Sequence, residues 1–227
     1  MAGIEFKTIL FALIGGILPA LLWLWFWLRE DNRRPEPRLL VLLTFLIGMI
    51  SVFLVLPVQR LFHGLGLNED MLTIIWAGTE EVIKFLVVWA IALNSKAADE
   101  PVDFAMYMIV GALGFAALEN ALFLIDPIDL GDSTVALITG NLRFLGAMLL
   151  HAVSSASVGI MLGLSFYRGW IAKKVYLLLG LGGAITLHSV FNFLIIRNDG
   201  SLLNVFSLLW VVTIIVLLMF EQLRRMS

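Results

Sequence analysis

The chain has 227 residues, of which 61% are hydrophobic and only 14% are charged, so it has too few polar side chains to cover a water-soluble globule. It contains no cysteine, which excludes disulfides, thiol nucleophiles and cysteine metal sites. Its net charge of −2 does not favour a nucleic-acid partner. From the high apolar content we expect an integral membrane protein that is surrounded by the lipid bilayer.

Long apolar stretches predict seven membrane-spanning helices, because about 20 apolar residues cross a hydrocarbon core of about 30 Å. The first stretch exceeds the roughly 7–15 apolar residues of a signal peptide, so we expect it to be retained. The expected spans are 6–28, 39–61, 72–93, 103–124, 143–166, 174–197 and 202–220. The fold class is therefore all-α, a polytopic helix bundle that forms a single membrane domain over residues 1–227.

The predicted connections between spans are short and polar, with one exception. Residues 125–142 form a longer segment that contains Asp126, Pro127, Asp129, Gly131 and Asp132. Such residues are typical of a surface loop, and whether the segment also holds a shallow re-entrant piece is left open.

Basic residues accumulate in cytoplasmic loops, so their distribution predicts how the chain is oriented. One side carries ten: Arg29, Arg33, Arg34, Arg38, Lys96, Arg168, Lys173, Lys174, Arg224 and Arg225. The other side carries four: Lys7, Arg60, Arg143 and Arg197. This difference predicts a cell-membrane protein with its N-terminus outside and its C-terminus in the cytoplasm. Arg143 is expected to reach the outer headgroups.

The seven predicted spans differ in composition. The first, second and seventh are dominated by Leu, Ile, Val, Phe and Trp, which is typical of helices that face lipid. The fourth to sixth are rich in Gly, Ala and Ser, which let helix backbones approach closely. We expect the third to sixth spans, within residues 72–197, to form the packed core.

Polar side chains interrupt the predicted core, where each ionisable group costs on the order of 2.5–3.5 kcal/mol. They are Glu80, Glu81, Lys84, Glu119, Asn120, His151, His188 and Asn192. At a rise of about 1.5 Å per residue, the acids and histidines lie about 9–14 Å below the outer surface. We therefore expect them to meet around a water pocket in the outer half of the bilayer.

The residue types in this group favour hydrolysis. Lys84 lies about one helical turn from both Glu80 and Glu81 and can balance only one of these carboxylates. A protonated and an ionised acid can together take a proton from water and return it to a leaving amine. Histidine and asparagine can stabilise a tetrahedral oxyanion by hydrogen bonds. Spacing alone does not separate the roles of Glu80 and Glu81.

Four short motifs follow one another on these spans. They are EExxK at Glu80–Lys84, FxxxE at Phe115–Glu119, HxxxxxxxG at His151–Gly159 and HxxxN at His188–Asn192. In this order they resemble the PrsW family of intramembrane proteases, which belongs to the larger group of CAAX prenyl endopeptidases and Abi-type proteins. The first, second and seventh spans match that family only in hydrophobic character.

The resemblance implies a glutamate-type protease that cuts a membrane-anchored protein, for example a single-span, anti-sigma-factor-like protein in a signalling pathway. No cofactor is expected. The implied catalytic residues are Glu80, Glu81, Glu119, His151, His188 and Asn192, with Lys84 as their charge partner.

The resemblance also implies a role for each of these residues. Either Glu80 or Glu81 would activate water, with Glu119 as partner. His188 and Asn192 would bind the oxyanion. His151 would hold a substrate carbonyl or a catalytic carboxylate. The prenyl endopeptidases carry histidine in the second motif where this chain has Glu119, which argues against prenyl-protein specificity.

Three other functions stay open at this point. A metal-dependent hydrolase would bind zinc through His151, His188 and Glu119, with Glu81 as base. A proton-coupled transporter would also bury ionisable groups, although paired repeats and broken helices are missing from the sequence. A b-type haem protein would use His151 and His188 as axial ligands. The substrate, the cleavage position and the oligomeric state are not specified by the sequence.

Overall fold

The computed structural model describes residues 4–30, 34–196 and 202–226, and these residues form a bundle of helices. The predicted all-α, polytopic fold is confirmed. The helices are α1 (Phe6–Glu30), α2 (Arg38–His63), α3 (Glu69–Val88), α4 (Pro101–Asp129), α5 (Ser133–Leu142), α6 (Met148–Leu164), α7 (Trp170–Ile196) and α8 (Leu202–Met226). A π-helical segment, η1 (Trp89–Leu93), extends α3, and a second, η2 (Arg143–Ala147), joins α5 to α6. The predicted loop positions of Arg33 and Arg197 lie outside the described residues.

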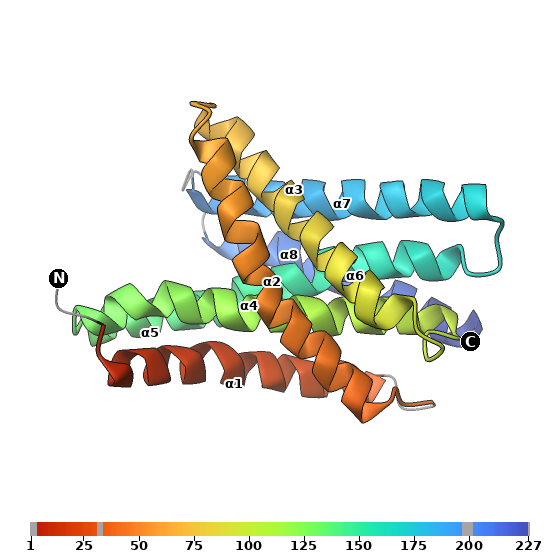
Figure 1. Ribbon diagram of the computed structural model, residues 1–227, viewed down its shortest axis with the longest axis horizontal. Coiled ribbons are helices and arrows are strands. Elements are labelled where there is room, and N and C mark those ends of the chain that lie inside the picture. The colour runs from red at the N-terminus through yellow and green to blue at the C-terminus, as the bar shows by residue number, and fades with distance from the viewer. Residues whose placement is uncertain (1–3, 31–33, 197–201, 227) are drawn as a thin grey trace.

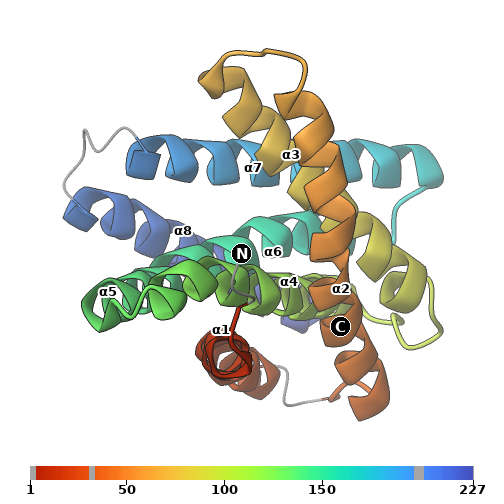
Figure 2. The same ribbon diagram turned by 60° about the vertical axis from the view of Figure 1, so that its left-hand side comes forward.

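The helices form seven rods, because α5, η2 and α6 are continuous. Within the described residues, six rods are long and apolar enough to cross a membrane. The exception among them is α3, which is made more polar by Glu69, Asp70, Glu80, Glu81 and Lys84. α1 begins at one end of the bundle, α8 ends at the other, and the chain reverses direction between rods (Figure 1). α2 and α3 form a hairpin that crosses the other rods steeply (Figures 1 and 2). The tilted hairpin brings α3 across the middle of α6 and α7.

The segment 125–142 is helical, so the prediction of a long surface loop was wrong. α4 continues to Asp129, and Gly131 adopts a left-handed conformation (φ 71°) that turns the chain back within three residues. Asp132 then caps α5 by accepting a hydrogen bond from the Val135 amide (3.0 Å). The Asp, Pro and Gly residues therefore mark one tight turn, and the apolar residues after it form a helix.

α4 lies at the centre of the bundle, with residues 105–117 all buried. Gly16 of α1 and Gly48 of α2 face the α4 backbone so closely that a Cβ atom would lie 2.2 Å and 2.1 Å from its carbonyl oxygens. The small residues of the fourth and fifth predicted spans thus do mark close packing. Those of α7 do so in part, since Gly182 and Gly183 face open space.

The glycine of the HxxxxxxxG motif has a packing role of this kind. A Cβ atom on Gly159 would lie 2.3 Å from the carbonyl oxygen of Phe104 and 2.5 Å from the Cα atom of Ala105, so the α4 backbone would have to move. We expect Gly159→Ala to lower the free energy of unfolding by about 1–3 kcal/mol, as overpacking does. SDS titration of the protein in mild detergent, followed by tryptophan fluorescence, measures this change.

Gly182→Ala is the matched control, because no described atom outside the local α7 backbone lies within 4 Å of the position its Cβ would take. Alanine is a better helix former than glycine by up to about 1 kcal/mol, so this variant should be as stable as the wild type or slightly more so. Equal unfolding free energies for the two variants would contradict the close packing of α6 on α4.

Candidate active site

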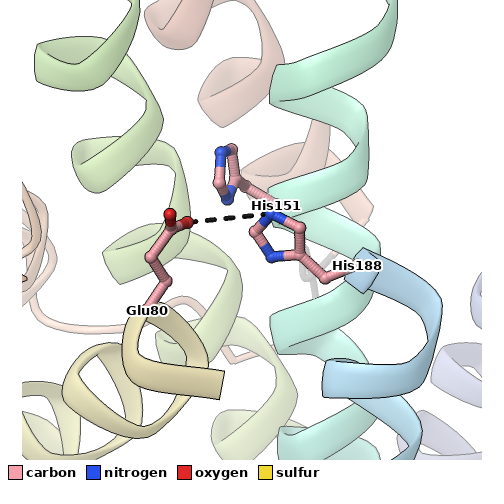
Figure 3. Close-up of side chains that lie close together, drawn as sticks. All are labelled: Glu80, His151 and His188. Carbon is pink, nitrogen blue, oxygen red and sulfur yellow. Dashed lines mark ion pairs between the residues drawn. The ribbon is translucent and has the colours of Figure 1, made fainter. Parts of the chain in front are cut away.

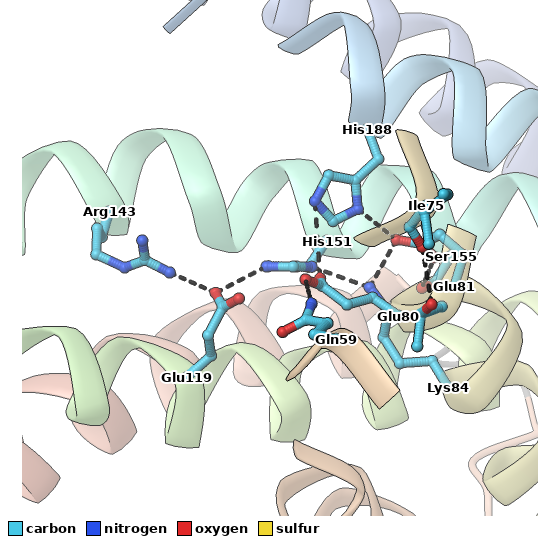
Figure 4. A network of polar contacts seen from close by, with 11 residues as sticks. Gln59, Ile75, Glu80, Glu81, Lys84, Glu119, Arg143, His151, Ser155 and His188 are labelled. Carbon is cyan, nitrogen blue, oxygen red and sulfur yellow. Dashed lines mark hydrogen bonds and ion pairs between the residues drawn. The ribbon is translucent and has the colours of Figure 1, made fainter. Parts of the chain in front are cut away.

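Four helices bring six of the predicted site residues together inside the bundle (Figures 3 and 4). They are Glu80, Glu81 and Lys84 of α3, Glu119 of α4, His151 of α6 and His188 of α7. The side chains of Glu81 and Lys84 have no exposed area, and both histidines are buried. The predicted convergence of charged groups from separate helices is therefore present in the structure.

Both oxygens of the Glu81 carboxylate are engaged by hydrogen-bond donors. Its Oε1 atom accepts from Lys84 Nζ (2.6 Å) and lies 2.9 Å from His188 Nδ1, and its Oε2 atom accepts from Ser155 Oγ (3.0 Å). Three partners from three helices hold this group in one position, so it is well placed to orient His188.

His151 links two charged groups through its two ring nitrogens. Nδ1 lies 2.9 Å from Lys84 Nζ, and Nε2 lies 3.1 Å from Glu119 Oε2. An ammonium group has no acceptor, so Nδ1 accepts and Nε2 donates its proton to the carboxylate. Phe115 of the FxxxE motif packs against both partners, with its ring centre 5.3 Å from that of His151 and 4.8 Å from Lys84 Nζ. This phenylalanine therefore has a packing role.

Glu119 is paired with Arg143, which the sequence had placed at the outer headgroups. The guanidinium group of Arg143 forms an ion pair with Glu119 and donates a hydrogen bond to the side-chain oxygen of Asn120. It also stacks over the ring of Phe123 at 3.9 Å. Arg143 points into the bundle because a carboxylate and an aromatic face are available there, so the expectation that it reaches the headgroups was wrong.

Glu80 differs from Glu81 in having one carboxylate oxygen without a hydrogen-bond partner. Oε1 accepts a hydrogen bond from Gln59 Nε2 of α2 (3.0 Å). Oε2 is buried without a hydrogen-bond partner among the described residues and lies 3.7 Å from His188 Nε2 (Figure 3). A separation above 3.5 Å between two polar atoms is wide enough for a bridging water.

Asn192 is the one predicted catalytic residue that does not join the network. It lies one helical turn beyond His188 and is half-buried, and no hydrogen bond connects it to the cluster in the described ranges. The cluster also includes Gln59, Arg143 and Ser155, which were not among the predicted site residues. Ser155 had a signal, since it follows His151 by four residues and so shares its face of α6. Gln59 had none, because only the steep crossing of α2 brings it to Glu80.

Three side chains meet closely enough to be considered as metal ligands, and they are not the predicted set. Glu80, His151 and His188 each offer one atom, all within 4.8 Å of one another, whereas the prediction had Glu119 in place of Glu80. Two histidines and a glutamate are a ligand set that zinc accepts. The hydrogen bonds oppose it, because both nitrogens of His151 are engaged and neither has a free lone pair. The site as arranged thus offers two free ligand atoms, one fewer than a zinc site needs.

Comparison with known proteins agrees with the motifs and the cluster. Residues 36–219 match the family model described as "PrsW family intramembrane metalloprotease". The chain belongs to the PrsW family. It is 28% identical over 213 residues to "Protease PrsW" of Geobacillus kaustophilus (strain HTA426), covering 88% of both chains. It is 26% identical over 190 residues to "Protease PrsW" of Bacillus subtilis (strain 168), covering 82% of this chain and 84% of the relative. No solved structure matches the chain.

Membership of the PrsW family makes the chain an intramembrane protease and confirms the predicted enzyme class. The transporter is not favoured by these relatives, and a haem protein finds no support among them. The matched residues include all four motifs and all the helices around the cluster. The PrsW-like cluster is therefore the candidate active site.

Proposed function

We propose that this protease hydrolyses a peptide bond of a single-span, membrane-anchored protein, with Glu80 as the base that activates water. An anti-sigma-factor-like protein is the substrate class that the family resemblance favours. The observation that carries the proposal is the Oε2 atom of Glu80, which is buried opposite His188 Nε2 and has no hydrogen-bond partner among the described residues. A buried carboxylate oxygen without a partner is costly, which favours a functional role.

Glu80 is preferred to Glu81 as the base because of their different partners. Both oxygens of Glu81 already accept hydrogen bonds, from Lys84, Ser155 and His188, so protonation of Glu81 would weaken the contacts that hold Lys84 and His188 in place. Glu81 instead fixes the ring of His188, whose Nδ1 proton it accepts. His188 then presents the lone pair of Nε2 toward Glu80, and a water between them would be held by both side chains.

A water held between Glu80 and His188 would be placed to hydrolyse a peptide bond. Glu80 Oε2 takes one proton as the water oxygen attacks the carbonyl carbon and forms the tetrahedral intermediate. The C–N bond then breaks, and Glu80 returns the proton to the leaving nitrogen. The products are a carboxylate and an amine, so the sum of their masses is that of the substrate plus one water.

The oxyanion of the intermediate needs a hydrogen-bond donor, and we assign that role to the Asn192 amide. His188 was also expected there, but its Nδ1 proton is used by Glu81 and a neutral ring has no second N–H group. Asn192 has no hydrogen bond to the cluster within the described part of the chain, so its amide is free to turn toward a substrate. Both ring nitrogens of His151 are engaged by Glu119 and Lys84, so we assign His151 the role of orienting these two side chains and not that of binding a substrate carbonyl.

The proposal includes no metal, because His151 lacks a free lone pair. We expect cleavage to be unchanged after treatment with EDTA or 1,10-phenanthroline and removal of the chelator by gel filtration. The measurement is the initial rate of substrate cleavage before and after treatment, with metal content checked by mass spectrometry. If the treatment abolishes cleavage and added zinc restores it, His151 must give up a hydrogen-bond partner in order to bind zinc together with Glu80 and His188.

The proposed orientation places the N-terminus outside the cell and the C-terminus in the cytoplasm. Basic residues support it, because nine described ones lie at the end of the bundle where α1 stops and α8 stops, and two lie at the opposite end. The nine are Arg29, Arg34, Arg38, Lys96, Arg168, Lys173, Lys174, Arg224 and Arg225, and the two are Lys7 and Arg60. Arg143 lies toward that same end as Lys7 and Arg60, but its charge is paired with Glu119 inside the bundle. Excess positive charge marks the cytoplasmic side.

The proposal is tested by reconstituting the protein in vesicles with candidate single-span substrates. Gel electrophoresis should show two new fragments that appear together and in equal amounts. A panel of single-span proteins that all stay intact with the wild-type enzyme, under conditions where it remains folded, would contradict the proposed substrate class.

A further inference from the structure

Arg143 makes more contacts with the site than any role assigned above requires. It pairs with Glu119, donates to Asn120 and stacks on Phe123, so one side chain holds three residues within about one turn of α4. Its side chain is only 18% exposed. Burying a guanidinium group within a membrane protein is costly, which indicates that these contacts have a function.

The π-helical segment η2 explains how Arg143 reaches the site. Arg143 precedes His151 by eight residues, and a regular α-helix would leave the two side chains about 80° apart around its axis. The i→i+5 hydrogen bonds of a π-helical segment accommodate one extra residue, which changes the relative direction of the side chains on either side by about 100° around the helix axis. Arg143 and His151 then point within about 20° of each other, and both contact Glu119. π-Helical segments often lie at functional sites for this reason.

We propose that Arg143 is a positioning residue that acts through Glu119 on His151. The guanidinium group holds the Glu119 carboxylate where it accepts the Nε2 proton of His151. With that proton fixed on Nε2, the Nδ1 lone pair of His151 faces Lys84, which in turn holds Glu81. Arg143 thereby sets the hydrogen-bond direction through the whole cluster, although it is not placed to touch Glu80 or the reacting water.

This inference rests on the proposed function for its kinetic test, which is a double-mutant cycle with Glu119. We expect Arg143→Gln to lower kcat by about 10–100-fold, the range for groups that orient a reacting residue, with KM changed less than about twofold. Arg143→Lys should recover part of the loss, since it keeps the charge but not the planar, multi-pronged contact. The double variant Arg143→Gln/Glu119→Gln should be no slower than Glu119→Gln alone, because the effect passes through Glu119.

Arg60→Gln is the control, because Arg60 is an exposed arginine at the same end of the bundle for which the described residues show no ion pair. Its kcat should equal that of the wild type. A second readout needs no substrate: the chain has three histidines, so nitrogen-15 NMR can follow each ring. Arg143→Gln should alter the His151 signal, identified by its absence in His151→Gln, and leave that of His63 unchanged.

Several results would overturn the inference. An unchanged kcat in Arg143→Gln would do so, as would single-variant effects that simply multiply in the double variant. A rise in KM alone, with an unaltered His151 signal, would show that Arg143 binds substrate directly. If the wild type cleaves no substrate, the proposed function fails, and the His151 signal still decides the role of Arg143.

Discussion

Replacing Glu80 by glutamine is expected to lower kcat by about 10²–10⁴-fold, the range for loss of a general base. The variant keeps the size of the side chain and its contact with Gln59, but it removes the oxygen lone pair that accepts a proton from water. KM should change little, because Glu80 acts on water and the fold is retained. The measurement is the initial rate of fragment release in vesicles, normalised to folded protein.

Glu69→Gln is the matched control for this experiment. Glu69 lies in the first turn of the same helix, is exposed and is outside the cluster, so its variant should cleave at the wild-type rate. Glu81→Gln should also be slow, because it frees His188, but it should lose stability as well. Wild-type cleavage by Glu80→Gln would remove Glu80 from the mechanism.

Replacing Lys84 by leucine is expected to lower the free energy of unfolding by about 3–5 kcal/mol, the usual cost of leaving one partner of a buried ion pair uncompensated. Lys84 and Glu81 are both fully buried, and Lys84 Nζ also bonds His151. SDS titration in mild detergent measures the change. This loss of unfolding free energy is the cost of leaving one buried charge without its partner, and it does not measure what the intact pair contributes to stability.

The double variant Lys84→Leu/Glu81→Gln separates a charge effect from a packing effect. It removes the uncompensated carboxylate, so part of the lost stability should return. Lys96→Gln, at an exposed position, should leave stability within about 0.5 kcal/mol of the wild type. A double variant no more stable than Lys84→Leu would indicate that the lysine matters for packing alone.

Hydrophobic patterning predicted the seven rods because a bilayer imposes one length on every crossing. The boundaries of α1, α2, α7 and α8 differ from the predicted ones by at most six residues, and the largest difference is at the end of α8. The segment before the fifth predicted span was misread, since Asp, Gly and Pro mark a short turn and a long loop equally well. Only the three-dimensional structure shows that the residues after this turn form a helix, α5, which continues through η2 into α6.

Most charged residues of the site were predictable from the sequence, because buried charges need partners. Burying Glu80, Glu81 and Lys84 in one span requires partners, and only the other polar spans supply them. The tilt of α2 that delivers Gln59 depends on tertiary packing, which has no local signal. The rotation within η2 that turns Arg143 inward is equally hidden, because one inserted residue leaves the apolar pattern of a span intact.

The separation of Glu80 from Glu81 also required geometry. Adjacent residues on a helix point about 100° apart, so one can be enclosed while the other faces a gap. Glu81 is enclosed by three donors, whereas Glu80 keeps a free oxygen.

The most direct measurement is intact-mass analysis of both fragments after a single-span substrate is cleaved in vesicles made with oxygen-18 water. The wild type should give two fragments whose new carboxylate carries heavy oxygen and whose junction lies in the outer half of the span, and Glu80→Gln should give none. A cut outside the membrane, or equal cleavage by Glu80→Gln and Glu69→Gln, would contradict hydrolysis by the buried cluster.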